Sequence, residues 1–167
     1  MILICYDGSE DARAAVARAA ALFPAQAATV LTVWQPFIHV VEHTGIGFGP
    51  MSTAPDAAAI DEASRRRAED LGRRGVELAE EAGLEAEPCV REEVGTTART
   101  ILGEAEQAGA QVIVMGSRGL TGLKSLLLGS VSHAVIQHAD RTVVIVPSPA
   151  VAASRARRVQ EEAVALG

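Results

Sequence analysis

The sequence predicts an α/β fold in which helices cover both faces of a parallel sheet. Five short apolar runs alternate with segments of helical spacing, and the fourth run, 110–116, is apolar at consecutive positions. Strands separated by helices pair in parallel through crossovers that place helices on the sheet faces. We therefore expect a doubly wound, five-stranded sheet with about four helices.

The chain begins with a strand, a helix and a second strand. Residues 2–6 are apolar and residues 28–34 are rich in β-branched side chains, so both runs predict strands. Between them, Ser9 can cap a helix with its hydroxyl, and Pro24 marks the end of that helix.

A loop and the longest helix follow. Glycines and prolines in residues 35–54 predict a loop, whereas Asp56 opens a helix that continues to about Ala82. The loop contains His39 and His43, whose four-residue spacing would suit a metal ion only on a helix. Because we expect this stretch to be irregular, we predict no metal pair there.

The third strand and third helix come next. Residues 86–92 predict a strand at the edge of the sheet, because Pro88 cannot donate to a strand ladder. Thr96 or Thr97 can cap the helix that follows, which is expected to end near Ala108.

The last part of the chain adds a helix, a strand and an extension. Residues 130–139 predict the fourth helix, and residues 141–147 predict the fifth strand. His133 and His138 on that helix fit packing or surface roles better than catalysis. Residues 148–167 are rich in alanine and charge, and they predict either a surface helix or a disordered extension.

Composition narrows the classes of function. The 167 residues carry a net charge of −6, which argues against a broad nucleic-acid surface, since such surfaces are basic. No apolar run is long enough to cross a bilayer. Cys5 and Cys89 lie far apart, and the chain has no secretory leader pattern, so we expect reduced thiols and a cytoplasmic protein.

The segment 114–135, VMGSRGLTGLKSLLLGSVSHAV, runs from a strand end through spaced glycines into a helix. Gly116 and Gly119 lack a Cβ, so the backbone can take positive φ and approach a ligand with its N–H groups. The helix after Gly129 offers unpaired N–H groups and the positive end of its dipole. The segment therefore predicts an anion site.

A second polar turn follows the first strand. In doubly wound sheets, ligands bind beyond the carboxyl ends of the strands where the winding reverses. If the first and fourth strands are neighbours, Asp7 and Gly8 face the segment 116–132 across one crevice. Arg118 and Lys124 could add positive charge to it.

The glycine pattern resembles that of a known family. Its members in this chain are Gly116, Gly119, Gly129 and Ser130. Their spacing looks like the nucleotide-binding signature of the universal stress protein family. The amino-terminal ILICYDGSEDARAAVARAA is similar to that family's first strand, acidic turn and helix. The resemblance covers residues 1–147 as one domain and leaves 148–167 as an extension.

This resemblance implies more than the residues alone. It implies a Rossmann-like fold of the adenine nucleotide alpha hydrolase type with strand order 3-2-1-4-5. It also implies ATP binding with Mg²⁺ or Mn²⁺, a regulatory role in stress response, and homodimers paired through the last strand, Thr142–Val146. In that order the second strand separates Cys5 from Cys89 by about 9–10 Å, beyond disulfide reach.

Site residues follow from the same resemblance. Asp7 resembles the acidic residue near ribose, phosphates and metal, and Val33 resembles a backbone contact for the adenine edge. The residues expected beside the ribose are Met115 and Gly116, and those expected to hold phosphates are Gly119, Gly129, Ser130, Val131 and Ser132. Tyr6 and Gly8 would flank the pocket, and Arg118 would add charge.

Other classes of function are weaker. The chain lacks the G-x-x-x-x-G-K-[ST] loop of P-loop NTPases, so we predict slow ATP hydrolysis at most and no catalytic residue. A receiver domain would need a lysine ending the fifth strand, where Val146 and Pro147 stand, and an adenylating enzyme of the pyrophosphatase-loop type would need SGG in place of YDGS. A ligand-free dimerisation module remains the alternative.

Overall fold

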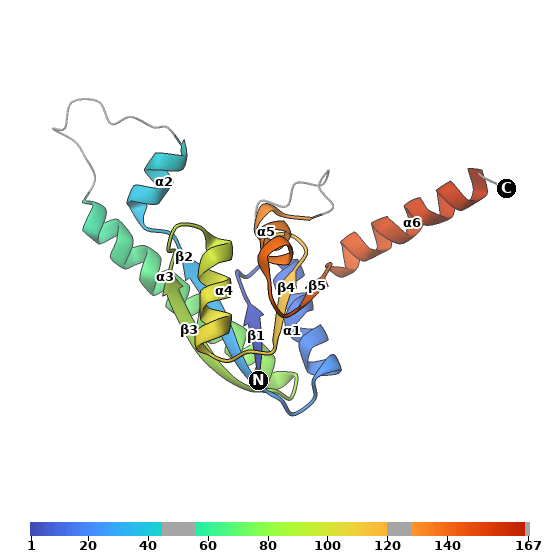
Figure 1. Ribbon diagram of the computed structural model, residues 1–167, viewed down its shortest axis with the longest axis horizontal. Coiled ribbons are helices and arrows are strands. Elements are labelled where there is room, and N and C mark those ends of the chain that lie inside the picture. Colours follow the sequence, from blue (N-terminus) through green and yellow to red (C-terminus); the bar gives the residue numbers. More distant parts are fainter. Residues whose placement is uncertain (45–55, 120–127, 166–167) are drawn as a thin grey trace.

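The computed structural model describes residues 1–44, 56–119 and 128–165, and its centre is a parallel sheet of five strands (Figure 1). The strands are β1 (Ile2–Cys5), β2 (Ala27–Trp34), β3 (Glu85–Glu92), β4 (Val112–Gly116) and β5 (Thr142–Val146). Their order is β3-β2-β1-β4-β5, and each neighbouring pair is parallel. The predicted strand order and the edge position of β3 are confirmed.

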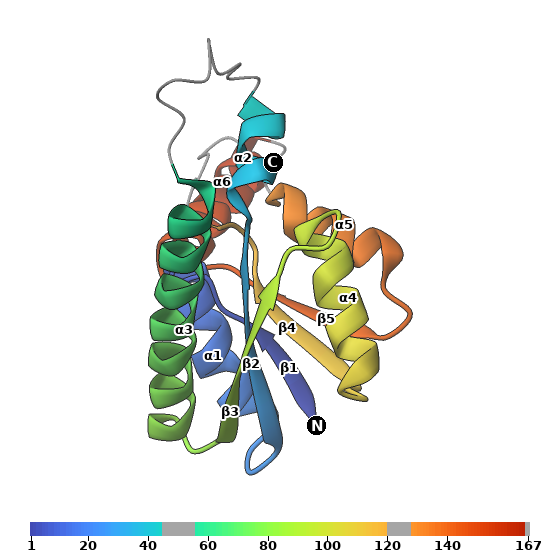
Figure 2. The same ribbon diagram turned by 90° about the vertical axis from the view of Figure 1, so that its left-hand side faces the viewer.

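Six helices accompany the sheet in the described part of the chain. They are α1 (Glu10–Leu22), α2 (Phe37–Thr44), α3 (Ala57–Glu81), α4 (Thr97–Gln107), α5 (Ser130–His138) and α6 (Pro149–Ala165). Figure 2 shows α1 and α3 on one face of the sheet and α4 with α5 on the other. Each face has its own buried apolar cluster, so the sheet is covered on both sides as expected of a doubly wound fold.

The predicted number of about four helices is wrong because two segments form helices that the sequence left open or assigned otherwise. Helix α2 lies in the segment predicted as a loop, where the backbone N–H of Phe37 donates to Asp61 Oδ1 of α3 at 2.6 Å. This tertiary contact satisfies a donor at the helix start, which no local pattern reveals. Helix α6 is the helical one of the two forms expected for the extension, and Figure 1 shows it projecting from the sheet domain.

The helical stretch at α2 changes the premise used for His39 and His43. We predicted no metal pair because we expected a loop, and that expectation is wrong for residues 37–44. The side chain of His43 lies outside those that the structure describes. Among the described residues, no group of three or more histidine, cysteine or acidic side chains is arranged to hold a metal ion.

Helix caps were predicted from local sequence, and the structure confirms them. The hydroxyl of Ser9 accepts from Ala12 N at 3.1 Å at the start of α1. Of the two threonines proposed to cap α4, Thr96 is the cap, accepting from Arg99 N at 3.2 Å. Thr97 is consequently the first residue of the helix.

Both cysteines are free, as predicted. Cys5 of β1 aligns with Leu31 of β2, which aligns with Cys89 of β3, so a whole strand separates the two thiols. No helix in the described part of the chain is both long enough and apolar enough to cross a membrane.

Candidate functional site

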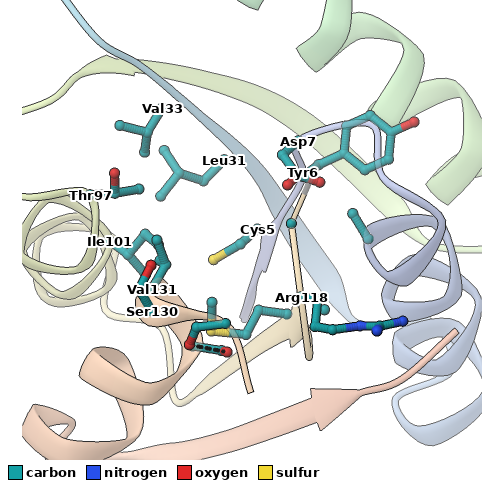
Figure 3. A pocket seen from close by; sticks show the side chains of 16 residues that line it. Cys5, Tyr6, Asp7, Leu31, Val33, Thr97, Ile101, Arg118, Ser130 and Val131 are labelled. Carbon is teal, nitrogen blue, oxygen red and sulfur yellow. Dashed lines mark hydrogen bonds between the residues drawn. The ribbon is translucent and has the colours of Figure 1, made fainter. Parts of the chain in front are cut away.

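A pocket opens beyond the carboxyl ends of β1 and β4, the place where the strand order reverses (Figure 3). Eleven of the twelve residues predicted for the site line it, all except Gly8. The lining residues that the sequence did not predict are Cys5, Ala12, Leu31, Thr97 and Ile101. The fold therefore brings the acidic turn after β1 and the glycines around α5 to one cavity.

The pocket has two chemically different ends. The glycine end, as we name it, is formed by Asp7, Gly119, Gly129 and Ser130. The apolar end is formed by Leu31, Val33, Thr97 and Ile101. Leu31 and Ile101 belong to the buried cluster under α4 and α5, and Val33 packs against it. These side chains form an apolar wall of the pocket.

Gly8 and Tyr6 contribute less than their positions suggested. Gly8 has φ +80°, and a Cβ there would lie 2.8 Å from Leu71 Cδ1, so the turn faces α3 and Gly8 is absent from the pocket lining. The buried ring of Tyr6 also lies on the α3 face, where a Cβ on Gly75 would come within 2.8 Å of it. Figure 3 shows the ring directed away from the pocket. Only the backbone of Tyr6 can serve a ligand here.

Asp7 is held in place at the glycine end. Its Oδ1 accepts from Ser9 N at 2.9 Å, which fixes the carboxylate at the start of α1. A Cβ on Gly119 would lie 2.8 Å from Asp7 Oδ2, so that oxygen sits directly beside the glycine backbone. The absence of a side chain at residue 119 is what allows this approach.

The glycines of the motif do not use the backbone freedom that we predicted for them. Among the described residues, positive φ is confined to Ala25 and to glycines outside the motif. A Cβ on Gly116 would meet Asp11 Cβ at 2.8 Å and Asp11 C at 2.9 Å. Gly116 is therefore required for the close packing of β4 on α1, and the positive-φ explanation is wrong.

The start of α5 forms the floor of the glycine end. Gly129 is the helix cap and supplies no side-chain hydrogen bond, so the first-turn N–H groups depend on other partners. Gly129 N donates to Ser117 O at 2.8 Å, and Ser132 Oγ lies 3.0 Å from the same oxygen. The Ser132 hydroxyl is buried in the loop, so Ser132 would contact a ligand through its backbone and not through its hydroxyl.

Asp11 is a component of the site region that the sequence analysis missed. Its carboxylate is 5% exposed and accepts from Ser117 Oγ at 2.7 Å and from Arg118 N at 3.1 Å. Burial alone would raise its pKa, but hydrogen bonds from Ser117 and Ser148, with the charge of Arg118, hold the pKa below its ordinary value. The sequence offered one signal, an acid four residues after Asp7 in the first turn of the predicted helix.

Arg118 faces this carboxylate more than it faces the pocket. Its Nε lies 3.8 Å from Asp11 Oδ2, and Figure 3 shows the guanidinium extending away from the cavity. Its predicted contribution of charge to the ligand is therefore not supported by the orientation of the side chain. Lys124, the other predicted cation, lies outside the described residues.

Cys5 lines the pocket between the two ends. Burial raises the pKa of its thiol to about 12, and the negative charge of Asp7 acts in the same direction. The thiol is therefore neutral at physiological pH and behaves as a small apolar group rather than as a nucleophile.

Comparison with known proteins places this geometry in a family. The model of the universal stress protein family matches residues 1–147. The chain belongs to this family. A universal stress protein of Thermus aquaticus is 34% identical over 145 residues, which cover 87% of this chain and 96% of that protein. Another, from Bacillus subtilis, is 46% identical over 70 residues.

Coverage differs among these relatives. The match spans 42% of this chain and 46% of the Bacillus subtilis protein, and it spans 45% of each mycobacterial relative. The chain thus spans about half the length of several curated relatives that it matches.

Solved structures of the universal stress protein family share the fold. The MJ0577 protein of Methanocaldococcus jannaschii superposes with a TM-score of 0.69 at 26% identity, covering 87% of this chain and 94% of that one. An Archaeoglobus fulgidus member solved with dAMP covers 87% of this chain and 95% of that one, with a TM-score of 0.53 at 21% identity. An Arabidopsis thaliana member solved with AMP covers 89% and 92%, with a TM-score of 0.59 at 15% identity.

Proposed function

We propose that this universal stress protein binds an adenine nucleotide, ATP with Mg²⁺ or Mn²⁺, and acts as a cytoplasmic regulator of stress response. The observation that carries the proposal is that one pocket joins Asp7 and the start of α5 to an apolar wall. Phosphates suit the N–H groups and dipole at a helix start, and a purine suits the apolar end. Family members bound to AMP, dAMP and cyclic AMP support the choice of adenine.

The residues that would hold the nucleotide are distributed between the two ends. Met115 and Gly116 also line the pocket and would border the ribose. The glycine end would take the phosphates through the backbone of Gly119, Ser130, Val131 and Ser132. Gly129, whose N–H already donates to Ser117 O, would serve by leaving the start of α5 uncovered. Val33 would contact the base with its backbone at the end of β2.

A divalent cation would depend on the nucleotide for most of its ligands. Asp7 is the carboxylate that lines the pocket in the described part of the chain, and one oxygen already accepts from Ser9 N. Its other oxygen, beside Gly119, suits a hard cation, and the phosphate oxygens would complete the coordination. With so few groups aimed at a γ-phosphate, slow hydrolysis or none is expected.

A homodimer paired through β5 is the second part of the proposal. β5 lies at an edge of the sheet, and its middle residues Val143, Val144 and Ile145 are only partly buried. A partly exposed apolar edge strand is an aggregation hazard unless another chain or element covers it. The same surface would serve the alternative function, a dimerisation module that binds no ligand.

The thermal midpoint of nucleotide-stripped protein tests the proposal. At about a hundredfold excess over the dissociation constant, a ligand adds about 2.7 kcal/mol, which raises the midpoint of a domain of this size by roughly 5–10 °C. We expect such a shift with ATP and Mg²⁺. No shift with ATP, AMP or cyclic AMP would favour the ligand-free module.

A further inference from the structure

The apolar end of the pocket contains a single hydroxyl among its four residues, that of Thr97 at the start of α4. Figure 3 shows Thr97 beside Val33 and Ile101, remote from Asp7. A purine in this end would be surrounded by hydrocarbon and would meet this hydroxyl as the principal polar side chain. The direction of the hydroxyl proton therefore influences which purine edge is accepted, in addition to the backbone contact proposed for Val33.

A buried carboxylate fixes that direction. Glu93, which follows β3, is 3% exposed, and it accepts hydrogen bonds from Gln35 Nε2 at 3.1 and 3.2 Å. His39 Nδ1 lies 3.9 Å from its Oε1. The hydroxyl of Thr97 forms a short hydrogen bond with Glu93 Oε2. Because a carboxylate only accepts, the Thr97 hydroxyl must be the donor.

We infer that Thr97 is a specificity-determining residue that accepts a hydrogen bond from the amino group of adenine. With its one proton given to Glu93, the hydroxyl keeps only lone pairs for a ligand. An exocyclic amino group can donate to them, whereas the 6-oxo group of hypoxanthine or guanine presents lone pairs to lone pairs. A site that cannot pair a buried polar group rejects that ligand.

Glu93 is a positioning residue in this inference, since it acts only through Thr97. Gln35 holds the carboxylate from the segment after β2, so both sides of the apolar end contribute to orienting one proton. The inference rests on the proposed nucleotide function and names the feature of the base that the site selects.

The test compares the affinities of ATP and inosine triphosphate, which differ in the purine 6 position, for the full chain and its variants. We expect the unaltered chain to prefer ATP by about tenfold or more, the value of one hydrogen bond. Thr97→Val keeps the shape but removes the hydroxyl, and it should reduce this preference severalfold, leaving only what the backbone of Val33 contributes. Thr97→Ser is the matched control and should retain it.

Glu93→Gln provides a second variant. A glutamine amide at residue 93 can donate to Thr97 Oγ1 and release the hydroxyl proton toward the pocket, so the preference for ATP should fall while Thr97 is intact. Circular dichroism of each variant verifies its fold. A general structural defect would lower the affinities for ATP and inosine triphosphate equally and leave the ratio of the two affinities unchanged.

Two results would overturn the inference, and they differ in what they say about the proposed function. If the unaltered chain binds ATP and Thr97→Val keeps the same ATP to inosine triphosphate ratio, nucleotide binding stands and the role of Thr97 falls. If the unaltered chain binds neither nucleotide, the proposed function and the inference fall together.

Discussion

The two ends of the pocket are built on different principles. At the glycine end, backbone groups and missing side chains shape the surface, as at Gly119 beside Asp7 and at Gly129 before α5. At the apolar end, side chains from β2 and α4 shape it. Backbone surfaces require particular residues at fixed spacing, whereas an apolar wall accepts many combinations. The first kind therefore leaves a motif in the sequence, and the second does not.

The substitution with the largest expected effect on ATP affinity, Gly129→Val, disrupts the glycine end alone. In Gly129→Val, the Cβ would find ordinary contacts, at 3.4 Å to Arg118 Cα and 3.5 Å to Ser117 O, so the fold should persist. The branched side chain would cover the first turn of α5, and ATP affinity should fall by about a hundredfold, to that of adenosine. Calorimetric titration with ATP and with adenosine measures this. Unchanged ATP affinity in folded protein would contradict our placement of the phosphates.

A smaller change at the same end tests the approach of Asp7 to the loop. Gly119→Ala should lower ATP affinity by about tenfold, because the new methyl group would lie 2.8 Å from Asp7 Oδ2 and force the carboxylate or loop to move. Gly103→Ala in α4 is the matched control, since a Cβ there meets nothing within 4 Å. Equal affinities for the two variants would show that the contact has no role in binding.

Removing the Asp7 carboxylate distinguishes the contribution of the cation to ATP affinity from that of the phosphate contacts. Asp7→Ala should weaken ATP binding by about fivefold in the presence of Mg²⁺ and much less in excess chelator, because the remaining groups bind phosphate without the cation. Parallel titrations with and without Mg²⁺ provide the measurement. An equal loss under both conditions would refute the metal role of Asp7.

The smallest effect on the nucleotide is expected from Asp11→Asn, which changes the support beneath the glycine end. The pKa of Asp11 is lower in the folded chain than its ordinary value of 3.8, so ionised Asp11 stabilises the fold fully above about pH 3.8. That contribution is lost as pH falls through the lower folded pKa. At pH 6 the free energy of unfolding of the unaltered chain should exceed that of Asp11→Asn by about 1–3 kcal/mol.

Thermal unfolding of both proteins between pH 2 and pH 6 tests this dependence. The difference in midpoint should narrow as the pH drops below about 3.8, because Asp11 is then protonated first in the unfolded chain and, at lower pH, in the folded chain as well. A difference that stays constant over this range would mean that Asp11 contributes through packing and not through its charge.

The sequence predicted most of the fold because its signals are local. Strand runs, the Ser9 cap and the edge position of Pro88 each depend on neighbouring residues, and the structure agrees with all three. Helix α2 was missed because its start is stabilised by Asp61, which is 24 residues away. A donor satisfied across the fold has no local signature.

The same reasoning separates the site residues that were predicted from those that were not. The motif indicated the glycine end, but it could not show that the side chains of Tyr6 and Arg118 turn away from the pocket. Leu31 could have been inferred, since it lies two residues before Val33 and so shares its face of β2. Glu93 and Asp11 read as ordinary surface acids until the fold buried them.

The position of Ser148 determines how far this chain can be shortened without loss of stability. Ser148 follows β5, is 2% exposed and hydrogen-bonds to Asp11, which in turn holds Ser117 and the backbone of Arg118. The family match ends one residue earlier, at residue 147. A protein shortened to the limits of the match would lose the hydrogen bonds from Ser148 to Asp11 beneath the glycine end, so we expect it to unfold at a lower temperature than the full chain.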